Sequence, residues 1–181
     1  MGPRVALVGF MGCGKTTTGR LLARHLGFGF VDTDVLIEGK CGMPIREIFR
    51  VKGEPFFRQV EREVLNDCLA SERQVLATGG GLWVNDENRS ALLGGAWCVH
   101  LRVSPECVWE RVRGNLAERP LLAAAEDPLA KIQELLAVRA PLYALAHVQV
   151  DTDGKLPDRV VREVVEHLKE RRPFDLPPLP I

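Results

Sequence analysis

The chain has 181 residues, and its 24 Lys and Arg balance its 24 Asp and Glu, so the formal net charge is zero. Hydrophobic residues make up 46% and charged residues 27%, which are ordinary values for a globular domain of this length. The charge balance argues against wholesale binding to nucleic acid or to an anionic membrane. No apolar run approaches the roughly 18 residues of a membrane span. We therefore expect one monomeric domain over residues 1–172 that binds neither nucleic acid nor a membrane.

The cysteines are odd in number and scattered, and no CxxC pair occurs, so neither a zinc site nor a disulfide framework is supported. Reduced thiols in a cytoplasmic protein are the better interpretation. No signal-peptide pattern precedes the first predicted strand, which favours the same compartment. The five are Cys13, Cys41, Cys68, Cys98 and Cys107.

Strands and helices alternate along the chain. Short apolar runs rich in β-branched residues predict strands, and apolar stripes at helical spacing predict helices. Gly and Pro clusters at 42–44, 53–55, 79–81 and 94–95 separate these elements. The predicted strands are 4–8, 28–31, 74–78, 97–101 and 147–150, and the predicted helices are 16–26, 35–40, 45–51, 56–70, 85–93, 128–146 and 157–171, with a further helix starting at 104–106.

This alternation predicts an α/β fold with three layers, in which a five-stranded, mainly parallel sheet is covered by helices on both faces. Ligands then bind at the carboxyl ends of the strands. Residues 114–127 show weak periodicity, and we expect them to form a mobile lid. Residues 173–181 hold four prolines, so we expect an extended tail, with a polyproline ligand for a partner as the alternative.

Residues 9–16 form a complete phosphate-binding loop between the first strand and the first helix. Glycines let the backbone amides turn toward a phosphate, and the helix N-terminus adds its positive end. Lys15 reaches the β- and γ-phosphates, and the Thr16 hydroxyl binds Mg²⁺. The motif predicts binding of a nucleoside triphosphate. The expected contacts are Gly12, Cys13, Gly14, Lys15, Thr16 and Thr17.

Asp32 and Asp34 lie two residues apart at a predicted strand end, so both side chains can face the same side. Phosphoryl transfer needs Mg²⁺ held in place and an acceptor hydroxyl oriented, and one carboxylate can serve each task. A solvated pair that only caps the following helix is the alternative.

Two arginines, Arg58 and Arg139, sit beside apolar helical residues. An arginine fork binds a carboxylate through two parallel hydrogen bonds, so a pair of them predicts an acidic acceptor. A surface salt bridge is the alternative for each arginine.

The chain lacks the Asn-Lys-x-Asp guanine-binding motif of GTPase switches, and its size favours a small-molecule kinase.

The motifs together resemble the shikimate kinases, a family of small P-loop kinases. All six occur in the family's order and at compatible spacing. They are residues 9–16, Asp32-Thr33-Asp34, Gly53-Glu54 with Phe57-Arg58 and Glu61, Thr78-Gly79-Gly80-Gly81, Arg119-Pro120-Leu121-Leu122, and Arg139-x-Pro141-Leu142-Tyr143.

The resemblance implies phosphorylation of the 3-hydroxyl of shikimate by ATP with Mg²⁺, a step toward chorismate and the aromatic amino acids. It implies that Asp34 contacts the acceptor hydroxyls and is the candidate base, that Asp32 supports Mg²⁺, and that Glu61 supports the shikimate side. By the same resemblance Lys15 and Arg119 act on the transferring phosphate. The shikimate contacts implied are Asp34, Arg58, Gly79, Gly80, Gly81 and Arg139, and adenine is placed near Arg111 or Arg113 and residues 151–155.

Two alternatives stay open. A gluconate-type or other polyol kinase shares the phosphate loop and the size, and a catalytically silent ATP-binding protein could act through its tail.

Cys13 departs from the small Ser or Ala often found at its position in the family, which raises the question of redox sensitivity. A helix N-terminus lowers a thiol pKa, so we expect Cys13 to be alkylated in the free protein and covered when ATP binds.

Overall fold

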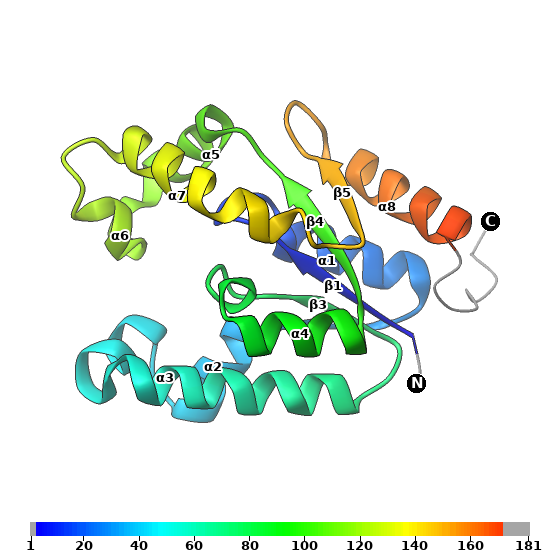
Figure 1. The fold of residues 1–181 in the computed structure, drawn as a ribbon, viewed down its shortest axis with the longest axis horizontal. Helices are drawn as coiled ribbons and strands as arrows, with labels where there is room; N and C mark the ends of the chain where they lie inside the picture. Colours follow the sequence, from blue (N-terminus) through cyan, green and yellow to red (C-terminus); the bar gives the residue numbers. More distant parts are fainter. Residues whose placement is uncertain (1–2, 172–181) are drawn as a thin grey trace.

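The computed structural model describes residues 3–171, whose strands form one parallel sheet in the order β2-β3-β1-β4-β5 (Figure 1). The α/β prediction is confirmed. The strands are β1 (Arg4–Val8), β2 (Gly29–Asp32), β3 (Gln74–Ala77), β4 (Trp97–Arg102) and β5 (Val148–Asp151). The α-helices are α1 (Lys15–Leu26), α2 (Thr33–Cys41), α3 (Ile45–Ala70), α4 (Asp86–Gly95), α5 (Pro105–Val112), α6 (Pro120–Ala123), α7 (Pro128–Tyr143) and α8 (Pro157–Arg171), and the 3₁₀ segments are η1 (Leu82–Val84) and η2 (Arg113–Glu118).

Alternate residues of the central strand β1 face two different helical layers. Val5 and Leu7 belong to the core that includes α1, α5 and α8. Ala6 and Val8 belong to the core that includes α3, α4, η1 and the end of α7. Because successive side chains of a strand point to opposite faces, a strand buried on both sides has the continuous apolar sequence seen here. The molecule therefore has three layers, with α1 and α8 side by side on one face and α3 and α4 on the other (Figure 1).

The chain reverses direction across the sheet at β1 and β3, which are adjacent strands. From β1 it runs through α1 to β2 on one side, and from β3 it runs through α4 to β4 on the other. Ligands of open α/β sheets bind at such a switch point, at the carboxyl ends of the strands. The phosphate loop follows β1 and the glycines of 79–81 follow β3, so this reversal brings the two segments together.

The helix boundaries differ from the sequence prediction in several places. The predicted break at 53–55 is a kink within α3, where Gly53 has φ 80° and ψ 170°. The predicted end of α4 at Gly94-Gly95 is wrong: the helix runs through both, and Gly95 lies so near Leu69 of α3 that a Cβ there would be 3.0 Å from that side chain. The predicted helix 128–146 ends at Tyr143.

The predicted lid is not free of regular structure, because residues 114–127 contain most of η2 and all of α6. Leu122 of α6 is fully buried and joins the core on the α1 and α8 side of the sheet. The segment predicted to be a lid is therefore anchored by a buried side chain rather than detached along its length. The proline-rich tail predicted at 173–181 lies outside the described residues. No helix among residues 3–171 is both long enough and apolar enough to span a membrane.

Candidate active site

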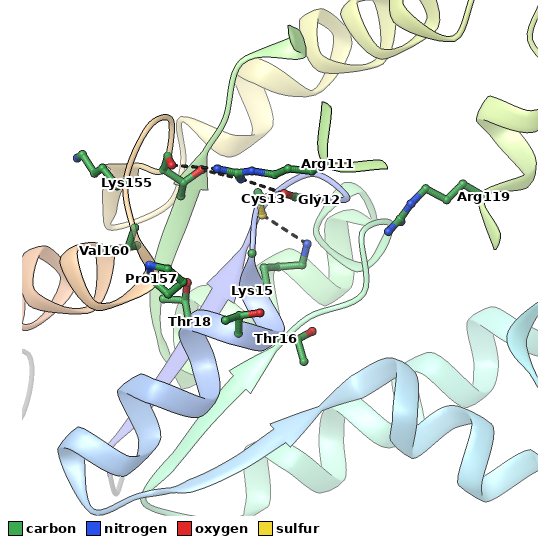
Figure 2. A pocket seen from close by; sticks show the side chains of 13 residues that line it. Gly12, Cys13, Lys15, Thr16, Thr18, Arg111, Arg119, Lys155, Pro157 and Val160 are labelled. Atoms are coloured by element: carbon green, nitrogen blue, oxygen red, sulfur yellow. Dashed lines mark hydrogen bonds between the residues drawn. The ribbon is translucent and has the colours of Figure 1, made fainter. Parts of the chain in front are cut away.

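The phosphate loop opens onto a cavity of about 450 Å³ (Figure 2). Gly14 has φ 94°, a left-handed conformation that favours glycine, and it precedes the first residue of α1. The Lys15 ammonium donates hydrogen bonds to the carbonyl oxygens of Gly9 at 2.9 Å and Phe10 at 3.0 Å. Every predicted loop contact lines the cavity: Gly12, Cys13, Gly14, Lys15, Thr16 and Thr17. The loop thus combines a helix N-terminus with a fixed ammonium group, which suits a polyphosphate.

The Cys13 side chain does not project freely into the cavity. It is 1% exposed and belongs to the buried core, and its Sγ lies 3.6 Å from Lys15 Nζ. A buried thiol is poorly accessible to an alkylating reagent, so the burial of Cys13 argues against the expected ready labelling of the free protein, which stays a prediction. The spacing could not show which way this side chain points. What Cys13 offers a ligand is its backbone, while its sulfur packs behind the loop.

Asp32 connects the phosphate loop to the following helix. Its Oδ2 accepts a hydrogen bond from the Thr16 hydroxyl at 2.8 Å, and its Oδ1 accepts one from the Asp34 amide at 3.1 Å as the N-cap of α2. A hydroxyl and a carboxylate in contact are suitable oxygen ligands for Mg²⁺, directly or through water. Among residues 3–171 no cluster of three His, Cys, Asp or Glu could hold a metal alone. The pair therefore fits a metal that brings its remaining ligands with the nucleotide.

Asp34 is held in a setting that favours its neutral form. Burial and, next, the negative charge of Asp32 raise its pKa to about 6, against the opposing charge of Lys15. A carboxylate with a pKa just below neutrality is deprotonated at pH 7 and can still accept a proton effectively. The alternative of a solvated cap fits Asp32 in part, because Asp32 does cap α2, but it does not fit the burial of Asp34.

The segment Gly79–Gly81 touches three of the predicted side chains. A Cβ on Gly79 would overlap Oδ1 of Asp34, so a larger residue there would displace the Asp34 carboxylate. The Gly80 carbonyl accepts a hydrogen bond from Arg139 Nη1 at 3.0 Å, and Gly81 lies against the guanidinium of Arg58. The segment is fixed where it leaves β3, because Thr78 Oγ1 donates to the Leu7 carbonyl of β1 at 3.0 Å. Asp34, Arg139 and Arg58 are therefore brought to one short stretch of backbone.

Arg58 is held by two glutamates of its own helix. Its Nη1 donates to Glu61 Oε2 at 2.9 Å, and its Nε and Nη2 donate to Glu54 Oε1. Glu61 is 1% exposed, and burial raises its pKa against the opposing effect of Arg58. Asn88 of α4 also donates to Glu61, at 3.4 Å. Sequence reasoning missed Asn88, because nothing in the spacing relates α4 to α3.

The far side of the cavity is formed by Arg111 and by the segment between β5 and α8 (Figure 2). Arg111 donates to the Gly12 carbonyl at 3.0 Å and to the Thr152 carbonyl at 3.0 Å. Arg113 pairs with Glu110 on the exposed surface of the domain and does not line this cavity. The helical period separates residues 111 and 113 by about 200°, so it could have indicated that only one of them faces the loop.

Three further cavity residues were not singled out from the sequence. Pro157 and Val160 lie in the first turn of α8, Thr18 lies in α1, and no motif marks any of them. Arg119 reaches the same cavity from the opposite side, between η2 and α6, and points toward the loop (Figure 2).

Comparison with known proteins decides the family. The sequence model described as shikimate kinase matches residues 11–169. A shikimate kinase of Symbiobacterium thermophilum is 46% identical over 169 residues, which cover 92% of this chain and 97% of that protein. A shikimate kinase of Thermus thermophilus is 45% identical over 164 residues, covering 91% and 89%. The chain belongs to the shikimate kinase family.

Solved structures agree with this assignment. The shikimate kinase of Acinetobacter baumannii in complex with shikimate superposes with a TM-score of 0.89 at 36% identity, over 96% of this chain and 97% of that one. A gluconokinase of Sinorhizobium meliloti superposes with a TM-score of 0.63 at 20% identity, over 93% of each chain, which shows a shared fold alone. The resemblance drawn from the six motifs is confirmed. Shikimate kinase activity, which uses ATP and serves aromatic amino acid biosynthesis, follows from family membership.

Proposed function

We propose that this chain transfers the γ-phosphoryl group of magnesium-bound ATP to the 3-hydroxyl of shikimate at the site built around Gly79–Gly81. The observation that carries the proposal is that this segment contacts Asp34, Arg139 and Arg58 together. A candidate base and two carboxylate-binding forks at one stretch of backbone suit an acceptor with both a hydroxyl and a carboxylate. Gluconate also has a hydroxyl and a carboxylate, on an open chain, so gluconate as the acceptor must be excluded by experiment.

The nucleotide phosphates bind in the cavity at the phosphate loop. The loop amides and Lys15 hold the β- and γ-phosphates, and Arg111 borders the adenine side in place of Arg113. Thr16 and Asp32 would hold Mg²⁺, which when bound would neutralise charge on the phosphate oxygens. The contact of the two side chains at 2.8 Å supports this assignment.

Asp34 orients the acceptor hydroxyl and accepts its proton as the hydroxyl oxygen attacks the γ-phosphorus, while the bond from the γ-phosphorus to the β–γ bridging oxygen breaks and ADP leaves. Its pKa of about 6 supports this role at neutral pH. Lys15 follows the phosphoryl charge, and Arg119 adds a second positive group from the lid over residues 114–127. Closure of this lid excludes water that would otherwise accept the phosphoryl group.

We also propose that the domain over residues 1–172 acts as a monomer in the cytoplasm. The five free cysteines are consistent with a reducing compartment. Light scattering across a range of concentrations tests the oligomeric state.

The substrate assignment is tested with an acceptor panel in a coupled ADP assay. Arg58→Ala and Arg139→Ala should each raise the KM for shikimate about ten- to a hundredfold with the KM for ATP unchanged, because each removes a charge-assisted hydrogen bond. Arg50→Ala is the matched control, since Arg50 is exposed and pairs only with Glu47 of its own helix turn among the described residues. The methyl ester of shikimate should be a poor substrate for the wild type, and gluconate should be inactive. Preference for gluconate, or equal use of ester and acid, would exclude the shikimate assignment.

A further inference from the structure

Tyr143 is the last residue of α7 and completes the motif that begins at Arg139, yet the proposed reaction gives it no task. Its side chain is 2% exposed, and its hydroxyl makes no hydrogen bond with any residue in the described part of the chain. Burying a hydroxyl without a partner is costly, so such a group in a native core calls for an explanation. Burial raises the pKa of Tyr143 to about 12, which keeps the hydroxyl protonated at neutral pH.

The ring of Tyr143 is fixed by its neighbours. It stacks on the ring of His100 in β4, with centroids 4.4 Å apart and planes 8° apart. Burial lowers the pKa of His100 to about 4, so this stacking partner is neutral under ordinary conditions. The preceding residue, Leu142, accepts a hydrogen bond through its carbonyl from Trp83 Nε1 of η1 at 2.8 Å. Tyr143 therefore lies between the sheet and η1 and has little freedom to turn.

Arg139 lies four residues before Tyr143, on the same face of α7. The Arg139 guanidinium is near enough to the Tyr143 hydroxyl that its positive charge and a side-chain hydrogen-bonding interaction both act to lower the Tyr143 pKa, against the larger effect of burial. The pair does not, however, have the geometry of a formed hydrogen bond. Arg139 Nη1 already donates to the Gly80 carbonyl, and the guanidinium lies over the Phe10 ring with its centre 5.4 Å from the centroid. The remaining N–H groups of Arg139 are those that would turn toward an acceptor carboxylate.

We infer that Tyr143 is a positioning residue for Arg139, whose hydroxyl accepts a hydrogen bond from the guanidinium when Arg139 binds the acceptor carboxylate. This inference rests on the proposed function. An arginine fork binds a carboxylate well only when its plane is fixed, and a fixed phenol oxygen behind the guanidinium supplies that restraint. The Gly80 carbonyl holds one nitrogen, the Phe10 ring supports one face, and the Tyr143 oxygen restrains the guanidinium from the helix side.

Tyr143→Phe tests the inference, because it removes the hydroxyl and keeps the stacked ring. We expect the KM for shikimate to rise about tenfold, since a hydrogen bond to a charged group is lost, with kcat and the KM for ATP within twofold of the wild type. The melting temperature of the ligand-free variant should be unchanged or higher, because the buried hydroxyl makes no well-aligned hydrogen bond there. A purely structural role predicts the opposite pattern, a lower melting temperature with an unchanged KM.

The same change in an Arg139→Ala background separates the two levels of the proposal. Tyr143→Phe should then add nothing to the shikimate KM, because the hydroxyl acts only through Arg139. If Arg139→Ala raises the KM while Tyr143→Phe leaves it unchanged, or if the effect of Tyr143→Phe is the same in both backgrounds, the inference about Tyr143 is wrong and the proposed function stands. If Arg139→Ala itself leaves the KM unchanged, the assignment of Arg139 to the carboxylate fails, and the inference with it.

Discussion

Asp34 shows at the scale of one residue how catalytic and structural demands conflict. The fold buries its carboxyl next to Asp32, and both effects disfavour the charged form that accepts a proton. Lys15 offsets part of this cost. The raised pKa of about 6 is therefore a stability penalty, present wherever Asp34 is ionised in the folded protein, and it is the kind of penalty that active sites carry.

Asp34→Asn should lower turnover by about a hundredfold or more, because the proton acceptor is lost, while nucleotide affinity stays within a few-fold. The variant should also be more stable than the wild type at pH 7, by up to about 3 kcal/mol for a pKa shift of this size. The sign follows from the shift: the folded protein holds this proton more tightly than the unfolded chain, so the penalty is complete above pH 6 and absent below about pH 4. Urea unfolding of the variant and the wild type at pH 7 and below about pH 4 measures this difference in stability. A variant that is less stable than the wild type at pH 7 would contradict the prediction.

The limits of sequence reasoning are clear at this scale. Asp32, Asp34, Arg58 and Arg139 could be selected because their chemistry and spacing match phosphoryl transfer to an acid. The direction of the Cys13 side chain could not, since it depends on packing against the core. The support that Asn88 gives Glu61 was equally invisible, because it joins two helices that only the tertiary structure brings together.

At the scale of elements, local rules held where local chemistry decides and failed where neighbouring helices decide. Gly53 and Pro55 produce the predicted break in α3, because glycine takes the left-handed conformation and proline starts the next segment. The glycines at 94–95 stay helical, because Gly95 packs closely on Leu69. The segment 114–127 is partly ordered by the burial of Leu122, which a weakly periodic sequence does not reveal.

Within the predicted lid, Nε of Arg119 is buried and makes no hydrogen bond to a described residue, although the side chain lines the cavity at the phosphate loop. Arg119→Ala should lower kcat by about a hundredfold with only a small change in the shikimate KM, because its charge acts on the transferring phosphoryl group. Transient and steady-state kinetics measure the two effects separately. A variant with normal kcat and a greatly raised KM would assign Arg119 to acceptor binding instead.

Closure of the lid makes a second prediction for this element. Amide hydrogen exchange over residues 114–127 should slow when nucleotide and shikimate are both bound, since the segment then packs over the cavity. The anchored Leu122 should be protected in both states. Equal exchange rates at the remaining positions, with and without ligands, would exclude a lid.

At the scale of the whole molecule, the strand order accounts for the position of the site. The reversal between β1 and β3 places the phosphate loop beside Gly79–Gly81, and β4 and α7 place His100 and Tyr143 behind them. Alternating elements predict a parallel sheet covered on both faces, but they do not give the strand order. The order fixes which carboxyl ends are neighbours, so the convergence of the site residues needed the structure.

His100 links this arrangement to acid stability. Its pKa is lowered to about 4 in the folded protein, so the unfolded chain takes up a proton first as the pH falls. The neutral ring contributes its full stability above about pH 6.5. As the pH falls from there to about 4, the folded protein loses on the order of 3 kcal/mol of this stability. His100→Phe keeps a ring against Tyr143 and should remove this loss. Unfolding curves across the range check it, and a stability difference between the two proteins that stays constant with pH would contradict it.

The transfer itself can be observed on the product. Purified protein is incubated with ATP, Mg²⁺ and shikimate, and the product is examined by phosphorus and proton NMR, with Lys15→Met as the control. We expect one phosphate ester on the 3-hydroxyl, formed in equal amount to ADP, and a rate lower by about a hundredfold or more in the control. ADP release independent of shikimate, a phosphate on another hydroxyl, or an undiminished rate in Lys15→Met would contradict the account.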